Sequence, residues 1–208
     1  LATGARWRRD GVAREHRNPI PGLDNITVLT PDDIMDGVSA SGSVVIFDDE
    51  HYYMGGVLAE KLRLDGHKVL LVTPAPDISN WTHNTMEQGR IQSRLLELGV
   101  ELAPQQKLVS VNSREVELAC VFTDRRTRHD CDTLVLVTER LPNDELYHAL
   151  QAKQEELTEV GIKTLRCIGD CFAPGIIAAS VHSGHLAARE FEEDIPEEVP
   201  FRRERVMV

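Results

Sequence analysis

The chain has 208 residues, of which 41% are hydrophobic and 27% charged, a composition typical of a soluble globular protein with one large or two small domains. Its 34 acidic against 23 basic residues give a formal net charge of −11, which argues against a nucleic acid or an anionic membrane as a partner, because both need a basic surface. No apolar run approaches the roughly 20 residues that cross a bilayer.

The first residues predict a short strand over 1–5, which ends at Thr3-Gly4, and then an irregular linker over 6–36. Prolines and glycines break any period in this linker, and Thr30-Pro31 is typical of the start of a single helical turn. The chain has no initial Met and no secretory signal, and it begins as if within a strand. We therefore expect it to be a piece of a longer chain.

From residue 44 onward the pattern alternates between apolar strands and amphipathic helices. Continuous apolar runs at 44–47 and 67–72 predict strands that are buried on both faces, and the spacing within 54–64 predicts a helix between them that ends at Asp65-Gly66. Together these segments predict a β-α-β unit, which is the start of a doubly wound sheet. A second helix is expected over 84–98.

The rest of the chain continues this alternation. Short strands are expected near 100–103, 107–112 and 115–122, then a polar turn at 124–127 and a buried strand over 131–137. A polar helix over 143–157, a strand over 165–170 and a helix rich in small residues over 176–193 follow. The sequence therefore predicts an α/β fold with a Rossmann-like, FAD/NAD(P)-binding arrangement of two lobes, the first of them incomplete.

Two motifs that lie far apart in the sequence belong together. Thr3-Gly4 follows the first expected strand, and Gly169-Asp170 ends a later one. A glycine just past a strand allows close approach of a ligand, and an aspartate there can hold a ribose or ribitol hydroxyl. Either motif alone is also a plain turn in many α/β proteins. Their order around a complete β-α-β unit makes Thr3, Gly4, Gly169 and Asp170 the candidate cofactor-binding residues.

The turn after the strand at 44–47 departs from a nucleotide-binding loop. A G-x-G-x-x-G motif would be expected there, but the chain has Asp48-Asp49-Glu50-His51-Tyr52-Tyr53-Met54 before Gly55. These carboxylates would repel a diphosphate, although they suit the helix dipole as an acidic cap. The next strand ends at Val72-Thr73-Pro74, without the acid or the arginine that would hold an NAD or NADP ribose. This loop is therefore expected not to bind NAD(P)H.

Further segments carry a resemblance that covers nearly the whole chain: Ala2-Thr3-Gly4-Ala5-Arg6-Trp7, Asn18-Pro19-Ile20-Pro21-Gly22, Leu58-Ala59-Glu60-Lys61-Leu62 with Gly66-His67, Leu134-Val135-Leu136-Val137-Thr138, Ile168-Gly169-Asp170, and Gly184-His185 with Ala188-Arg189-Glu190. Their order resembles flavoprotein reductases in which a nicotinamide-type domain is inserted into an FAD-type domain. More closely, it resembles the C-terminal region of the trimethylamine and dimethylamine dehydrogenases, in the wider Old Yellow Enzyme-like family of NADH:flavin oxidoreductases.

The resemblance implies an incomplete FAD-type, ADP-binding domain over 1–35 plus 140–208, and an inserted NAD(P)-type domain with a degenerate glycine loop over 36–139. For the parent protein it implies an oxidoreductase that is a homo-oligomer, with an upstream barrel domain that carries FMN and a 4Fe-4S cluster. This chain would then hold an ADP or FAD-like nucleotide in its FAD-type lobe, carry no catalytic residue and be inactive alone.

The resemblance also implies a partner, an electron-transfer flavoprotein, and points to Trp81 as the docking aromatic, since the related enzymes carry an aromatic in this stretch near their electron exit. A partly buried anchor for its own loop is the other interpretation of Trp81. Two other functions stay open: a working NAD(P)H-binding module, as in a dienoyl-CoA reductase-like enzyme, and an interaction module without any nucleotide.

The remaining candidate groups favour no metal site. Cys120, Cys131, Cys167 and Cys171 are expected to be reduced, inert thiols in the cytoplasm. Cys167 and Cys171, and likewise His182 and His185 on one helix face, lack further ligands at a suitable spacing.

Overall fold

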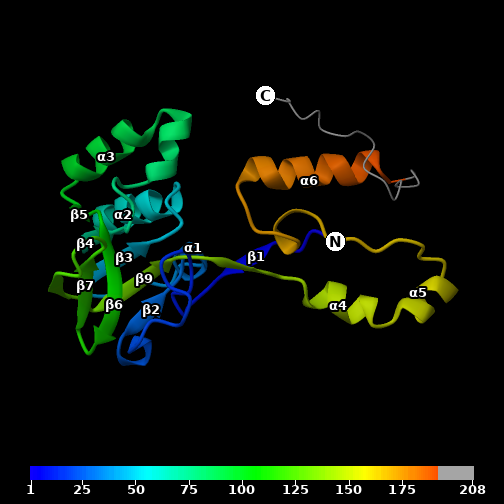
Figure 1. Ribbon diagram of the computed structural model, residues 1–208, viewed down its shortest axis with the longest axis horizontal. Coiled ribbons are helices and arrows are strands. Elements are labelled where there is room, and N and C mark those ends of the chain that lie inside the picture. Colours follow the sequence, from blue (N-terminus) through cyan, green and yellow to red (C-terminus); the bar gives the residue numbers. More distant parts are fainter. Residues whose placement is uncertain (192–208) are drawn as a thin grey trace, which may run out of the picture. The chain divides into compact units, whose positions relative to one another are not determined.

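The computed structural model describes residues 1–191, and the chain divides into two compact units (Figure 1). The larger unit is Arg6–Leu141, and the smaller one combines Leu1–Ala5 with the chain from Pro142 onward. Strands β1 (Ala5–Trp7) and β10 (Arg140–Pro142) pair where the chain passes from one unit to the other. Strand β1 therefore begins later than the strand expected over 1–5. Its position depends on its pairing with β10, which lies far away in the sequence and is not part of any local pattern.

A parallel five-stranded sheet forms the centre of the larger unit. Its order is β2-β9-β3-β4-β5, with bounds Thr27–Leu29, Thr133–Val137, Ser43–Asp48, Lys68–Val72 and Glu101–Ala103. In β3, Val45 is in register with Leu70 of β4 and with Leu134 of β9. The predicted β-α-β unit and α/β class are confirmed, with the two central strands buried on both faces as in other parallel sheets.

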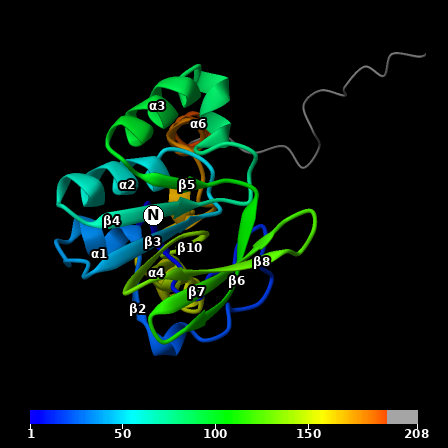
Figure 2. The same cartoon turned by 90° about the vertical axis from the view of Figure 1, so that its left-hand side faces the viewer.

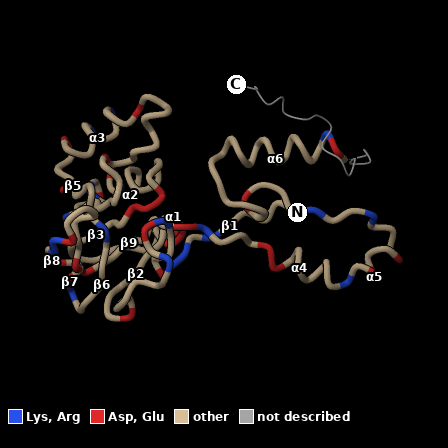
Figure 3. Tube along the Cα trace, in the orientation of Figure 1, with Lys and Arg blue, Asp and Glu red and all other residues tan. Residues whose placement is uncertain are grey.

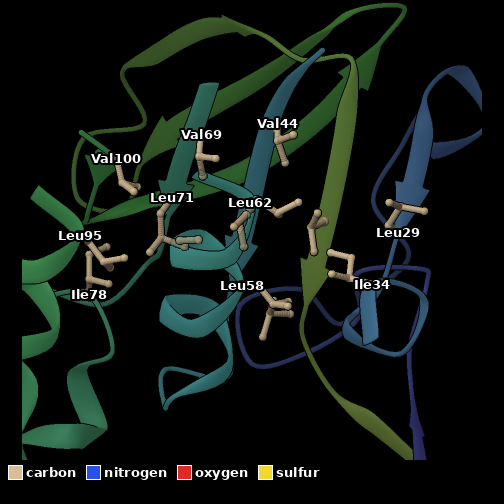
Figure 4. Packing of buried hydrophobic residues seen from close by; sticks show 14 residues of the cluster. Leu29, Ile34, Val44, Leu58, Leu62, Val69, Leu71, Ile78, Leu95 and Val100 are labelled. Atoms are coloured by element: carbon tan, nitrogen blue, oxygen red, sulfur yellow. The ribbon is translucent and has the colours of Figure 1, made fainter. Parts of the chain in front are cut away.

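Helices α2 (Met54–Leu64) and α3 (Gln88–Glu97) cover one face of this sheet (Figure 2). Leu58 and Leu62 of α2 share one buried cluster with Val69 and Leu71 of β4 and Leu95 of α3 (Figure 4). The helix predicted over 54–64 is confirmed at both ends. The helix predicted over 84–98 begins later, because the 3-10 helix η2 (Asn80–Thr85) precedes it.

A three-stranded antiparallel sheet covers the other face: β6 (Gln106–Asn112), β7 (Glu115–Cys120) and β8 (Arg126–Asp130). The segment expected as a polar turn at 124–127 is therefore partly strand. Its residues carry no apolar alternation, because β8 is an exposed edge strand whose Arg126 pairs with Glu117 of β7.

Residues 6–35 belong to the larger unit and not to the terminal lobe in which we expected them. Two contacts explain this difference. Strand β2 hydrogen-bonds to β9 at the edge of the main sheet, and Ile20 is 3% exposed within the core beneath it. The expected helical turn is confirmed as α1 (Pro31–Met35), where Thr30 and Asp33 form a capping box.

The smaller unit contains α4 (Glu145–Gln151), α5 (Gln154–Glu159), the 3-10 helix η3 (Gly169–Cys171) and α6 (Ile177–Arg189). The single helix predicted over 143–157 is thus divided into two. The strand predicted over 165–170 is wrong: Arg166 and Ile168 bond to Leu1 alone, which is too short a pairing for a strand, and Gly169 begins η3. The helix predicted over 176–193 is confirmed as α6, but it ends earlier, at Arg189; residues 192 and 193 lie outside the described residues.

Acidic and basic residues are interspersed along both units (Figure 3). Within residues 1–191, no helix is long and apolar enough to span a membrane.

Candidate functional site

The loop between β3 and α2 is closed by its own first carboxylate. Asp48, the last residue of β3, is 0% exposed, and its Oδ1 accepts hydrogen bonds from the backbone N–H groups of Glu50 (3.1 Å) and His51 (3.0 Å). His51 takes a left-handed backbone conformation, with φ of 68°, which lets the loop turn back on Asp48. The side chain of Asp48 therefore occupies two donors that a phosphate-binding loop would present to its ligand.

Glu50, two residues after Asp48, lies near a cation. Its Oε1 is 3.9 Å from Nη2 of Arg140. The N-cap residue of α2, Tyr53, makes no side-chain cap hydrogen bond, and the first turn of α2 carries no acidic residue. The acidic cap that the sequence suggested is therefore not formed on this helix, because Asp48 bonds to N–H groups within the loop instead.

Asp49 joins the loop to the segment that precedes the sheet. Its Oδ2 accepts the backbone N–H of Glu15 at 2.8 Å, and its Oδ1 lies 3.2 Å from Nε2 of His51. Asp49 is 1% exposed, so this pair is shielded from solvent. Sequence reasoning missed the contribution of Glu15, because it lies in a stretch without periodicity or motif that could have marked it.

Gly55, the first glycine after β3, packs against Asp48. A Cβ atom at this position would lie 2.5 Å from Oδ2 and 2.6 Å from Cγ of Asp48. The carboxylate therefore fills the space directly against the helix backbone, where a dinucleotide phosphate would have to approach.

Burial changes the acidity of both loop carboxylates. Desolvation raises the pKa of Asp48 to about 7, although the N–H of His51 opposes the shift. Desolvation also raises the pKa of Glu50, against the opposing charge of Arg140. Oδ2 of Asp48 has no hydrogen-bond partner within residues 1–191, so no contact there offsets the loss of hydration on burial.

We expect Gly55→Ala to lower the free energy of unfolding by about 1–3 kcal/mol, because the added methyl overlaps the buried Asp48 carboxylate. Gly89→Ala is the matched control on α3, where an added Cβ meets nothing within 4 Å. That change should be neutral or stabilise by up to about 1 kcal/mol, since alanine favours a helix. Urea unfolding measures both, and equal effects would contradict the packing of Asp48 against Gly55.

The residue that follows β4 is a buried threonine. Thr73 stands at the position that an acid would occupy in an NAD-binding domain, and it is 0% exposed. Its Oγ1 accepts the backbone N–H of Ala75 at 3.3 Å.

Trp81 lies on η2, beside the loop between β3 and α2, and is 41% exposed. Its backbone N–H donates to the carbonyl of His51 at 2.9 Å, and the guanidinium carbon of Arg14 lies 4.4 Å from its ring centroid, a cation–π contact. Ser79 and Met86, which bracket η2, both have positive φ angles. The indole is therefore held in place by the loop and by Arg14 while part of it faces solvent.

The four candidate nucleotide-binding residues lie in the smaller unit, where the structure brings residues 1–4 beside 166–171. Ile168 donates its N–H to the carbonyl of Leu1 at 3.0 Å, and Thr3 donates its hydroxyl to the carbonyl of Asn143. Gly4 has a positive φ, and nothing lies within 4 Å of the position its Cβ would take. The first motif thus leaves open space beside a left-handed backbone.

Gly169 and Asp170 organise the turn that precedes α6. The N–H of Gly169 donates to Oγ of Ser183 at 2.9 Å. Oδ1 of Asp170 accepts the hydroxyl of Ser180 at 2.7 Å and the N–H of Gly175 at 3.3 Å. These contacts give Asp170 a defined orientation at the end of a helix.

Among residues 1–191, no group of three or more His, Cys, Asp or Glu side chains is arranged to hold a metal ion.

Comparison with known proteins adds a family match. A family model described as the OYE-like second alpha/beta domain matches residues 29–133. Dimethylamine dehydrogenase from Hyphomicrobium sp. (strain x) is 33% identical over 227 residues, an alignment that covers 99% of this chain and 31% of that protein.

Two solved structures are also similar. Histamine dehydrogenase from Rhizobium sp. 4-9 has a TM-score of 0.94 and 44% identity, and the match covers 100% of this chain and 32% of that one. The 6-hydroxypseudooxynicotine amine oxidase from Pseudomonas geniculata N1 has a TM-score of 0.87 and 40% identity, over 92% of this chain and 28% of that one. The chain therefore spans less than a third of the length of each of these proteins.

Proposed function

Because the chain belongs to the family of OYE-like second alpha/beta domains and is homologous to dimethylamine and histamine dehydrogenases, we propose that it is the accessory region of an amine dehydrogenase-like oxidoreductase. In this proposal an upstream barrel domain of the parent carries FMN and a 4Fe-4S cluster and oxidises the amine. This region supplies no catalytic residue. It holds a structural ADP- or FAD-like nucleotide in the smaller unit and docks an electron-transfer flavoprotein through the larger one.

The observation that carries the proposal is the occupied loop between β3 and α2. Asp48 takes the N–H groups of Glu50 and His51, so a dinucleotide would have to displace a buried carboxylate in order to bind. This arrangement favours outward electron transfer over hydride uptake from a nicotinamide. It makes a working NAD(P)H module, the dienoyl-CoA reductase-like alternative, the weaker proposal.

The nucleotide part of the proposal depends on the smaller unit. The left-handed, open backbone at Gly4 suits the close approach of a diphosphate, and Asp170 is oriented next to α6 by Ser180. When bound, an adenine nucleotide would supply no chemistry there, and its role would be to hold the two chain segments together. Thr3, Gly4, Gly169 and Asp170 are the residues that we propose to hold it.

Calorimetric titration of the whole protein with NADH and NADPH tests the first part, with no binding expected at micromolar concentration. Micromolar binding would support the NAD(P)H-module alternative and overturn our proposal. Heat denaturation followed by chromatography tests the second part, with about one adenine nucleotide released per chain. Release of none would favour an interaction module without nucleotide.

Trp81→Ala should slow reduction of an electron-transfer flavoprotein by the amine-reduced protein by about 30-fold, the size expected for an interface tryptophan worth about 2 kcal/mol. Trp81→Phe should retain most of the rate, because it keeps a flat apolar ring. Phe122→Ala is the control, since it removes another exposed aromatic, 77% exposed, at the end of β7. Stopped-flow absorbance follows the acceptor, and an unchanged rate in Trp81→Ala would show that docking occurs elsewhere.

A further inference from the structure

Arg14 and Trp81 meet at the surface of the larger unit, although they are far apart in the sequence. The guanidinium carbon lies 4.4 Å from the centroid of the indole ring, and both side chains are exposed. Within residues 1–191 the side chain of Arg14 forms no hydrogen bond and no ion pair, so its N–H groups are available to a ligand. The stacked pair therefore offers a flat apolar ring next to an unpaired cation.

The backbone on both sides of Arg14 is held in place by the larger unit. Ala13 is 1% exposed and donates its N–H to the carbonyl of His16 at 2.8 Å. Glu15 donates its N–H to the buried carboxylate of Asp49 at 2.8 Å. These contacts and the stacking on the indole fix where the guanidinium lies, so less conformational entropy is lost when a ligand binds to it.

The backbone around Trp81 has an uncommon conformation. His51, whose carbonyl accepts the N–H of Trp81, has a positive φ, and so do Ser79 and Met86, which flank η2. They are three of the six non-glycine residues with a positive φ within residues 1–191. Such conformations cost free energy and persist where surrounding contacts hold them. Because Trp81 is nevertheless 41% exposed, this backbone presents the indole at the surface and does not bury it.

The chemistry of the pair indicates what it would bind. A guanidinium has a planar fork of N–H donors that matches the two oxygens of a carboxylate, and it keeps this fork while it stacks on an aromatic ring. A partly exposed tryptophan is typical of the centre of a protein interface. Since the chain has a formal net charge of −11, a carboxylate of a partner gains most beside a cation that no acid of this chain has paired.

We propose that Arg14 and Trp81 together form the recognition element for the electron acceptor. Arg14 binds an aspartate or glutamate of the acceptor protein, and Trp81 packs against the apolar surface beside that carboxylate. This inference rests on the proposed function, because it takes an electron-transfer flavoprotein as the partner. It adds the residue and the partner chemistry that set the orientation of docking, since a charged and an apolar contact side by side disfavour other orientations.

Stopped-flow reduction of an electron-transfer flavoprotein by the dithionite-reduced parent protein tests this inference. Varying the acceptor concentration separates the half-saturating concentration from the limiting rate. Arg14→Gln should raise the half-saturating concentration by about tenfold and leave the limiting rate unchanged, because it weakens association and not electron transfer. Arg14→Lys should raise it by about threefold, because an ammonium keeps the charge but lacks the planar fork.

Arg125→Gln is the matched control. It removes the same charge from another exposed arginine, between β7 and β8, and should leave both quantities unchanged. An effect in Arg125→Gln equal to that in Arg14→Gln would overturn the inference, because general charge and not the stacked guanidinium would then be responsible.

Salt dependence distinguishes an ion pair from a loss of packing. The difference between wild type and Arg14→Gln should shrink from about tenfold at about 50 mM NaCl to about threefold or less at about 500 mM, because salt screens an exposed pair of charges. The difference between wild type and Trp81→Ala should persist at both concentrations. An effect of Arg14→Gln that does not change with salt would overturn the contact with a carboxylate.

Three further outcomes separate this inference from the function on which it rests. Failure of the wild-type protein to reduce the electron-transfer flavoprotein would overturn the docking function and this inference with it. Reduction by the wild type with an unchanged half-saturating concentration in Arg14→Gln would overturn the role of Arg14 alone. Urea unfolding of Arg14→Gln should match that of the wild type, because Arg14 is exposed, and a clearly lower midpoint would contradict a role in recognition alone.

Discussion

Asp48→Asn should stabilise the protein at pH 8 and flatten the dependence of the unfolding free energy on pH. The pKa of Asp48 is raised from 3.8 to about 7 by burial, so the folded protein binds a proton that the unfolded chain releases between these values. Stability therefore falls as pH rises from about 4 to about 7. A shift of this size corresponds to on the order of 4 kcal/mol at pH 8, and asparagine removes the cost of ionisation.

Asparagine also keeps the loop closed, because its carbonyl oxygen can accept the N–H groups of Glu50 and His51. Thermal or urea unfolding from pH 4 to pH 8 measures the difference between wild type and variant. The two curves should approach each other near pH 4 and separate toward pH 8. A constant difference across this range would mean that Asp48 does not titrate within it.

Asp132→Asn is a control of opposite sign. Hydrogen bonds from the N–H and hydroxyl of Ser43 lower the pKa of Asp132, so its contribution to stability is present above its unfolded pKa and is lost as pH falls through the folded one. This variant should be destabilised at neutral pH, and the loss should shrink below about pH 4. Comparison of the two variants distinguishes the pH dependence of stability that a buried carboxylate causes from that of a carboxylate hydrogen-bonded near the surface.

Phe47→Ala should lower the free energy of unfolding by about 3–5 kcal/mol, because it leaves a cavity at the centre of the larger unit. Phe47 is 0% exposed, and its backbone is in register with Val72 of β4 and Leu136 of β9. Its ring also lies 5.8 Å from that of His16, so it supports the segment that carries Glu15 toward Asp49.

Urea denaturation of wild type and variant measures this loss. Phe122→Ala removes the same side chain at a site that is 77% exposed and should change stability by less than about 0.5 kcal/mol. Equal losses in both variants would contradict the assignment of Phe47 to the core. Because Phe47 immediately precedes Asp48, partial loss of this core should also loosen the loop and increase its hydrogen exchange.

The loop between β3 and α2 supports the proposal that this region does not take up a nicotinamide. A phosphate-binding turn needs ligand-free N–H groups and a close approach that only small residues allow. Here the carboxylate of Asp48 accepts hydrogen bonds from the N–H groups of Glu50 and His51. The lack of a side chain at Gly55 leaves the space that this carboxylate occupies. In this loop the carboxylate of Asp48 lies where a ligand phosphate would need space.

The sequence by itself determined the central elements of the larger unit. The strands at β3 and β4 and the helix α2 follow from local periodicity and from the stop at Asp65-Gly66, because short-range apolar spacing suffices to specify a buried strand or an amphipathic helix. The acidic run 48–50 also indicated a loop unsuited to a pyrophosphate, since charge and the absence of glycine are local properties.

Only the tertiary structure decided how that loop is closed and which segments support it. Asp48 turns back on the N–H groups behind it, and Glu15, Arg14 and strand β2 arrive from a stretch without any periodic pattern. The strand expected over 165–170 does not form, for a similar reason. A local sequence pattern does not specify which segment a strand will pair with. Such contacts join residues far apart in the chain, so their energies depend on neighbours that no local pattern contains.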